Sequence, residues 1–300
     1  SVGTGVGVNA LLSRLLGEGK KDRAKVTADN AVLLAIIASI AFAIFGAIGT
    51  KAFFDAQTNS ESIRSLGYSY LSIVSIFSFG LILEVTYERI LQSTGKTIYN
   101  MITQGIGAII NIILDPILIF GLLGAPKLGV AGAAIATVTG QIIAMILSFV
   151  FNMIYNEEVD ISFGKHIFKP DLIIIKDIYK VGIPSIAMQS MSTLMMLGLN
   201  KILVRYSDMA VNVLGIYYKL QSFVFMPIFG LNNGMTPIVA YNYGARNKDR
   251  IMKALKYSFL SSIVIMVIGT AIFWIFPKEL MILFSPNEEM LRLGIPALRI

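Results

Sequence analysis

The sequence predicts an all-α polytopic membrane protein with two pseudo-symmetric lobes of six helices. Three observations lead to this prediction: the composition, the length of the apolar runs and an internal repeat. Hydrophobic residues make up 55% of the chain and charged residues 14%, and the mean hydropathy is +0.73. A soluble domain carries about 25% charged residues, so this chain has too few to cover a folded surface with polar groups.

The apolar runs have the length of membrane-spanning helices, which need about 20 residues. We expect seven full helices, over residues 30–50, 65–83, 97–123, 130–155, 183–199, 211–243 and 257–276. Two shorter apolar stretches open and close the chain, one ending near Leu16 and one beginning at Leu291. We therefore expect a piece of a longer protein, incomplete at both ends.

Basic residues gather in every second connection between these runs. The cation-rich connections lie around Gly17, Gly95, Lys165 and Gly244, and the connections between them carry few cations and several acids. Cytoplasmic loops of membrane proteins carry an excess of Lys and Arg, so we place these four connections in the cytoplasm. Cations in loops next to the membrane surface then account for the net charge of +7 and the pI of 9.4. We therefore expect no nucleic-acid partner.

An internal repeat with an offset of 227 residues sets the expected domain organisation. The connection after Gly17 matches the one after Gly244 (244 − 17 = 227), and Gly67 matches Gly294 (294 − 67 = 227). A period of this length accommodates six helices, an even number, so both copies cross the membrane in the same sense. We expect an N-terminal lobe over residues 1–155 (end of helix 2 to helix 6), a cytoplasmic inter-lobe linker over 156–180, and a C-terminal lobe over 181–300 (helix 7 to the start of helix 10).

The linker contains apolar residues that predict a short amphipathic helix on the inner membrane surface. These are Phe168 and residues 172–175. We expect this helix to end before Pro184, where the next span begins.

Few residues suit catalysis or metal binding. The chain has no cysteine and one histidine, His166, and it contains no paired-His motif, no GxxxxGK phosphate loop and no Asp-rich diphosphate motif. We therefore expect neither an enzyme nor a bound cofactor or metal.

Six short motifs are spread along the chain. They are GVG and SRLLG within residues 5–17, ERILQSTG at 88–95, NIILDPILIF at 111–120, GVAGAAIAT at 129–137, GIP at 182–184 and PIVAYN at 237–242. Together they resemble the multidrug and toxic compound extrusion (MATE) transporters, in the branch of bacterial multidrug exporters, and the resemblance covers the whole chain. It implies an exporter of drugs and toxic cations in the bacterial inner membrane, driven by inward flow of protons or sodium ions.

Asp115 is the leading candidate for the coupling site. It lies mid-helix in an otherwise apolar run, and a charge there costs about 2.5–3.5 kcal/mol on insertion scales. Asn111 lies one turn earlier on the same face, where its amide can hydrogen-bond the carboxyl group, and Pro116 loosens the helix beside it. The resemblance also implies a first-lobe cation site with this Asp and Asn, and we add Thr137 from the sixth-helix motif. The alternative is an Asp near the helix end that caps or pairs.

Glu84 and Glu88 share a helical face near the predicted cytoplasmic end of the fourth helix. They belong either to a cation pathway, with Glu88 favoured because its motif contains it, or to the group of side chains that extend to the inner interface. Two lysines, Lys201 and Lys219, lie within or next to predicted spans. We expect each to be a structural partner of another residue or a cation that extends to the membrane interface.

Methionine and aromatic side chains suit varied lipophilic cations. We expect substrate contacts at Met188, Gln189, Met195, Phe223 and Met226, although lipid-facing and packing roles explain most such residues. Besides the lipid bilayer we expect small cationic or lipophilic substrates as partners, and a monomer. Two other functions stay open: a lipid-linked oligosaccharide flippase of the same superfamily, or a channel.

Overall fold

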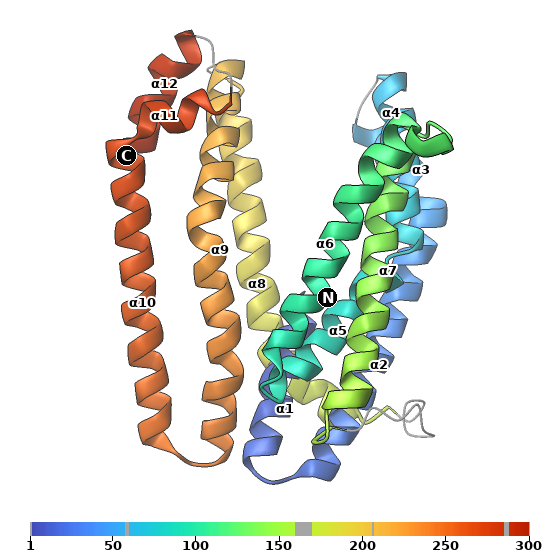
Figure 1. Ribbon diagram of the computed structural model, residues 1–300, viewed down its shortest axis with the longest axis vertical. Helices are drawn as coiled ribbons and strands as arrows, with labels where there is room; N and C mark the ends of the chain where they lie inside the picture. Colours follow the sequence, from blue (N-terminus) through green and yellow to red (C-terminus); the bar gives the residue numbers. More distant parts are fainter. Residues whose placement is uncertain (1, 58–59, 160–169, 206, 285–287, 300) are drawn as a thin grey trace. The chain divides into compact units, whose positions relative to one another are not determined.

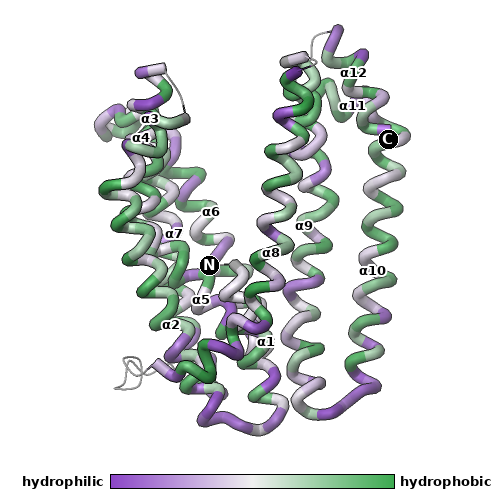
Figure 2. Tube along the Cα trace, turned by 180° about the vertical axis from the view of Figure 1, so that it is seen from behind, coloured by the Kyte–Doolittle hydropathy of each residue, from purple (hydrophilic) through white to green (hydrophobic). Residues whose placement is uncertain are grey.

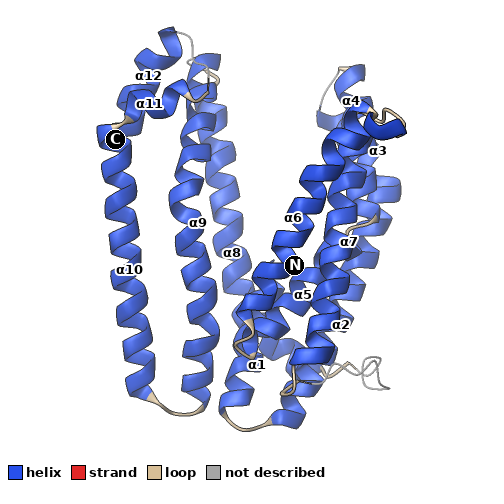
Figure 3. Ribbon diagram, in the orientation of Figure 1, coloured by secondary structure: helices blue, strands red, loops and turns tan. Residues whose placement is uncertain are grey.

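The computed structural model describes residues 2–57, 60–159, 170–205, 207–284 and 288–299, and all regular structure in these ranges is helical (Figures 1 and 3). His166, Phe168 and Lys165 lie outside the described residues. The chain forms two compact units, Ser1–Pro184 and Ser185–Ile300, which we call the first and the second unit.

The first unit is a bundle around α7. Its elements are α1 (Val2–Gly17), α2 (Lys21–Ile44), the π-helical turn η1 (Phe45–Gly49), α3 (Thr50–Gln57), α4 (Glu61–Ile76), α5 (Phe79–Ser93), α6 (Thr97–Phe120), the 3-10 turn η2 (Leu122–Gly124), α7 (Val130–Tyr155) and the start of α8 (Leu172–Leu203). α7 packs against α4, α5 and α6, and α5 also packs against α1 and α2. The core of this bundle contains the fully buried side chains of Leu12, Val32, Ile90 and Ile178.

α6 and α7 approach closely because glycines face each other where the helices meet. A Cβ atom added to Gly140 would lie 2.6 Å from the carbonyl oxygen of Gly107, and one added to Gly107 would lie 3.1 Å from the carbonyl oxygen of Gly140. In lipid, helices associate through such close packing and through polar contacts, because hydrocarbon tails remove the hydrophobic drive between them. The two glycines therefore set the spacing of α6 and α7.

The expected span over residues 65–83 is not one continuous helix but is broken into two. α4 ends at Ile76 and α5 begins at Phe79, and the two helices differ in direction by 45°. Phe77 leaves the helical region, and the glycine that follows, Gly80, packs so closely on α7 that a Cβ there would lie 2.9 Å from Ile142. The break lets α5 turn toward α7.

The expected helix boundary before Pro184 is also wrong. α8 runs without interruption from Leu172 to Leu203, with Pro184 inside it. The helix begins at Leu172 because the Asp171 carboxylate accepts hydrogen bonds from the backbone N–H groups of Ile173 and Ile174. Proline inside a helix removes one hydrogen bond, which membrane helices tolerate when neighbouring groups compensate.

Among the described residues, five helices are long and apolar enough to cross a membrane, or six if the bent α4–α5 pair is one span. α8 is not among the five, whereas a span was expected over residues 183–199. Polar residues inside α8 lower its hydropathy, among them Gln189, Ser190, Ser192, Thr193 and Asn200. Figure 2 shows mostly hydrophobic helical shafts and hydrophilic α1–α2 and α9–α10 connections.

The second unit contains the rest of α8, together with α9 (Asp208–Gly244), α10 (Lys248–Ile275), α11 (Pro277–Ile282) and α12 (Glu288–Arg299). α9 packs against α10 and α12, and α11 packs against α12. Its small core is formed by Ile216, Leu220, Met281 and Leu298.

The helix boundaries confirm the repeat. α1 and α9 end 227 residues apart (244 − 17), α2 and α10 begin 227 residues apart (248 − 21), and so do α4 and α12 (288 − 61). The connections α1–α2 and α9–α10 also share one turn geometry. The N–H of Lys20 donates to the carbonyl of Leu15, and the N–H of Asn247 donates to that of Asn242.

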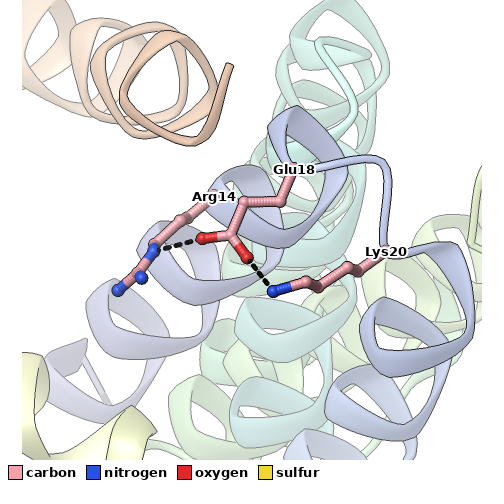
Figure 4. A network of polar contacts seen from close by, with 3 residues as sticks. All are labelled: Arg14, Glu18 and Lys20. Atoms are coloured by element: carbon pink, nitrogen blue, oxygen red, sulfur yellow. Dashed lines mark hydrogen bonds and ion pairs between the residues drawn. The ribbon is translucent and has the colours of Figure 1, made fainter. Parts of the chain in front are cut away.

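The residue before each of these donors has a positive φ, +73° at Gly19 and +56° at Arg246. Helices often end on such a left-handed residue, usually glycine. In the first copy an ion-pair cluster adds to the turn. Glu18 accepts hydrogen bonds from Arg14 Nε at 2.8 Å and from Lys20 Nζ at 2.7 Å (Figure 4).

Candidate functional site

The structure brings Asp115, Asn111 and Thr137 together in the first unit. Asn111 Nδ2 donates to Asp115 Oδ1 at 3.4 Å within α6 and to Thr137 Oγ1 at 3.3 Å on α7. The Thr137 hydroxyl in turn donates to the backbone carbonyl of Ala133 at 2.9 Å. The expected hydrogen bond between Asn111 and Asp115 is thus present, and the chain of bonds ties α6 to α7.

Asp115 lies closer to the end of its helix than the sequence suggested. It stands five residues before the last residue of α6, Phe120, and it is half-buried. It does not cap the helix, because Gly121 in a left-handed conformation ends it. Pro116 follows, and its missing N–H leaves the carbonyl of Ile112 without the usual helical partner.

A cavity of about 220 Å³ opens beside this group, between α5, α6 and α7. Its lining comes from Glu84 on α5, from Gln104, Gly107, Ala108 and Asn111 on α6, and from Thr137, Gly140, Gln141 and Ala144 on α7. Small residues at the α6–α7 contact leave this space, and polar side chains surround it. Asn111 and Thr137 belong both to the cavity wall and to the Asp115 group.

Glu84 and Glu88 are buried, so of the two alternatives for them, the one in which they extend to the interface is wrong. They are 7% and 6% exposed. Glu88 accepts hydrogen bonds from Gln104 Nε2 at 2.8 Å and from Thr103 Oγ1 at 3.4 Å, which fastens α5 to α6. Glu84 instead faces the cavity. A part in a cation pathway stays a prediction for both.

Gln104 and Gln141 are the polar residues that sequence reasoning missed. A signal for them exists, because Gln104, Asn111 and Asp115 recur at intervals of seven and four residues, which places them on one face of α6. Gln141 likewise follows Thr137 by four residues on α7. Each spacing relates a residue already predicted as a site residue, Asn111 or Thr137, to one that was missed, Gln104 or Gln141.

The expected substrate contacts lie on two helices of the second unit. Met188, Gln189 and Met195 are on α8, and Phe223 and Met226 are on α9. All five side chains are exposed in this unit, and Phe223 is 75% exposed. Their role stays a prediction.

The two lysines differ in their surroundings. The ammonium group of Lys219 lies 5.9 Å from the ring centre of Phe284, a cation–π distance, in line with a structural partner. Lys201, near the end of α8, is exposed.

Comparisons with known proteins give one consistent result. The MatE family model matches residues 1–117 and 184–300. The chain is 31% identical over 300 residues to the multidrug export protein MepA of Staphylococcus haemolyticus, covering 99% of the chain and 64% of that protein. It is 26% identical over 297 residues to the probable multidrug resistance protein NorM of Thermotoga maritima, covering 98% and 62%. The chain therefore spans less than two thirds of the length of these relatives.

Solved structures of transporters match the fold. The chain superimposes on crystal structures of a MATE protein in the straight and the bent conformation with TM-scores of 0.90 and 0.88, at 25% identity in each case. Both matches cover 99% of this chain and 65% of the other. A MOP superfamily transporter from Pyrococcus furiosus matches with a TM-score of 0.89, also at 25% identity, covering 99% and 66%.

Proposed function

Because this chain belongs to the MatE family of multi-pass cell-membrane transporters, we propose that it is part of an exporter of lipophilic or cationic compounds. In this proposal, protons or sodium ions flow inward as the compound leaves. Support for the substrate class comes from the relatives, which are named multidrug export and multidrug resistance proteins. The Met and aromatic side chains on α8 and α9 fit such substrates, because thioethers and ring faces attract soft, bulky cations.

The Asp115 group supports ion coupling at a defined place. A carboxyl group inside a membrane protein is inserted cheaply only when it is protonated, paired or bound to a cation. Asp115 has an amide donor, Asn111, as its hydrogen-bond partner and no Lys or Arg at ion-pair distance in the described part of the chain. Its charge is therefore free to be neutralised by an arriving proton or sodium ion.

Occupancy of Asp115 would change the bonding between α6 and α7. The Asp115 carboxylate accepts a hydrogen bond from Asn111 Nδ2, which also donates to Thr137 Oγ1. A proton on Asp115 turns an acceptor into a donor, and a bound ion takes the lone pairs that the amide uses. Either event rearranges the Asn111–Thr137 bond, and Pro116 provides a weak point at which α6 can bend. Such a local change biases a two-state equilibrium of the lobe.

The test uses the intact protein in proteoliposomes, with dye efflux measured under separately imposed proton and sodium gradients. Asp115→Asn keeps the shape and removes the titratable charge, so gradient-driven export should be abolished. Asn111→Ala leaves the acid in place and should slow export less. Asp55→Asn is the matched control, because Asp55 forms an ion pair with Arg64 (3.1 Å) on a half-exposed surface.

Export by Asp115→Asn at the wild-type rate would place coupling elsewhere. Two further results would overturn the exporter itself. Steady currents across a planar bilayer would identify a channel, and translocation of lipid-linked oligosaccharide without dye export would identify a flippase.

A further inference from the structure

Glu84 is a buried acid with no side-chain partner among the described residues. Its side chain lines the cavity between α5, α6 and α7, and the residue is 7% exposed. In the part of the chain that the structure describes, no side chain forms a hydrogen bond or an ion pair with its carboxyl group. A charge in such a place is costly unless a proton or a cation compensates it.

Three other polar side chains of the cavity wall donate hydrogen bonds to acceptors of the protein. The amide of Gln104 donates to Glu88, the amide of Asn111 donates to Asp115 and Thr137, and the Thr137 hydroxyl donates to Ala133. These donors are therefore occupied by acceptors of the protein itself.

The cavity wall also contains oxygen acceptors that no described donor uses. Gln141 Oε1 is buried and has no hydrogen-bond donor among the described residues. The amide oxygen of Asn111 and the carboxylate of Glu84 are also available. Carboxylate and amide oxygens are the ligands that hard cations prefer, and a wall of acceptors next to an acid disfavours an anion.

We propose that the Glu84 cavity is a cation-binding site for a hard monovalent ion such as Na⁺, distinct from the Asp115 group. Glu84 supplies the negative charge, and Gln141 and Asn111 supply neutral oxygens. The cavity volume of about 220 Å³ holds a sodium ion with several waters, since one water occupies about 30 Å³ of liquid.

The cavity also joins the two acids. Asn111 contacts the Glu84 cavity on one side and bonds Asp115 on the other. An ion leaving Glu84 thus reaches the Asp115 group by crossing the Asn111–Thr137 bridge. This transfer rests on the proposed exporter function, whereas binding at Glu84 does not.

Glu88 provides the control. It lies one turn from Glu84, is equally buried and carries the same charge, but its two oxygens accept bonds from Thr103 and Gln104. Glu88→Gln keeps an oxygen for one of these donors, and Glu88 itself does not line the cavity.

The experiment measures binding of radioactive Na⁺ to the purified intact protein in lipid nanodiscs, where no export is needed. Glu84→Gln should weaken sodium affinity by more than about tenfold, because even groups behind the ligands change metal affinity by about 10- to 100-fold. Gln141→Leu should weaken it by about tenfold. Glu88→Gln should keep most of the wild-type affinity, and Asp115→Asn should keep the binding that depends on Glu84.

Three outcomes would overturn the proposal: wild-type affinity in a folded Glu84→Gln variant, loss of all binding in Asp115→Asn alone, or no saturable binding in the wild-type protein. The last result would leave a proton as the occupant of Glu84. Thermal unfolding and size-exclusion profiles establish that each variant is folded. Failure of dye export in the wild-type protein with intact sodium binding would remove the exporter function and leave this site standing.

Discussion

The two units solve the packing of membrane helices in different ways. The first unit buries polar side chains on most of its helices, among them Asn9, Asp29, Glu84, Gln92, Thr103 and Asn152. In the second unit, Asn242 is the single buried polar residue among those described. Several of the first unit's side chains bond between helices, as Asn9 Nδ2 does to Gln92 Oε1 at 2.8 Å. Ser222, Thr236 and Asn242 in the second unit bond to carbonyls of their own helix. Polar contacts thus lock the first unit, where the candidate ion chemistry lies.

The largest contrast should come from adding one methyl group to a glycine in each unit. Gly140→Ala places a Cβ 2.6 Å from the Gly107 carbonyl oxygen and should cost about 1–3 kcal/mol of unfolding free energy. Gly215→Ala in α9 meets no atom within 4 Å and should gain about 0.5–1 kcal/mol, because alanine favours the helix. Unfolding in sodium dodecyl sulfate measures both. Equal effects at the two positions would break the comparison.

A second contrast concerns one buried asparagine from each unit. Asn152 Nδ2 donates to the Tyr87 carbonyl on α5 at 2.9 Å, and its oxygen accepts from Asn156. Asn152→Ala leaves these buried partners unsatisfied and should cost about 1–3 kcal/mol. Asn242→Ala removes one bond to the Ile238 carbonyl of the same helix and should cost less than about 1 kcal/mol. The same unfolding assay ranks them, and a larger loss at Asn242 would contradict the view that bonds between helices stabilise the first unit.

A third contrast exchanges the residues at equivalent turns. Arg246 adopts a φ of +56°, which costs a residue with a side chain about 1–2 kcal/mol relative to glycine. Arg246→Gly should therefore raise the unfolding free energy by about 1 kcal/mol, and Gly19→Ala should lower it by about the same amount. Thermal melting of both variants checks the opposite signs. A stabilised Gly19→Ala would mean that the turn relaxes to another conformation.

The smallest contrast is the pH dependence of the ion-pair cluster around Glu18. In the second copy of the repeat, Ala245 stands in the place of Glu18. Hydrogen bonds from Lys20 and Arg14 lower the pKa of Glu18 below its ordinary value of 4.5. A lowered folded-state pKa contributes stability above the unfolded-state value, and this contribution is lost as the pH falls through the folded-state value. Glu18→Gln should thus lower stability by about 0.2–0.5 kcal/mol at pH 7, the range for exposed pairs, and by nothing below the lowered pKa. Melting curves from pH 7 downward should show this difference shrink as the pH falls through the lowered pKa, and high salt should reduce the difference at pH 7.

The sequence predicted the features that depend on local pattern. Apolar length located the cores of the spans, and the 227-residue offset reappears in the first residues of α10 and α12. The Asn111–Asp115 bond was predicted for the same reason, since residues four apart share a helical face. The predicted helix ends were less accurate. α2 and α10 begin at Lys21 and Lys248, in charged segments that precede their apolar parts.

Features that depend on packing between helices could not be predicted in this way. The break after Ile76 and the continuity of α8 through Pro184 follow from neighbouring helices, which hydropathy does not describe. The burial of Glu84 is of the same kind. An acid near a helix end reads as exposed in the sequence, and only the packing of α5 against α2, α6 and α7 buries it.

Arg246 has a consequence for biosynthesis. The cost of its backbone conformation exists only once α9 has folded and the turn has closed. The loop charges predict a cytoplasmic α9–α10 connection, and on that prediction the charge of Arg246 acts earlier, while the nascent hairpin enters the bilayer. A residue that weakens the finished turn can therefore still favour the correct insertion of the hairpin, and the two demands are met at different times in the life of the chain.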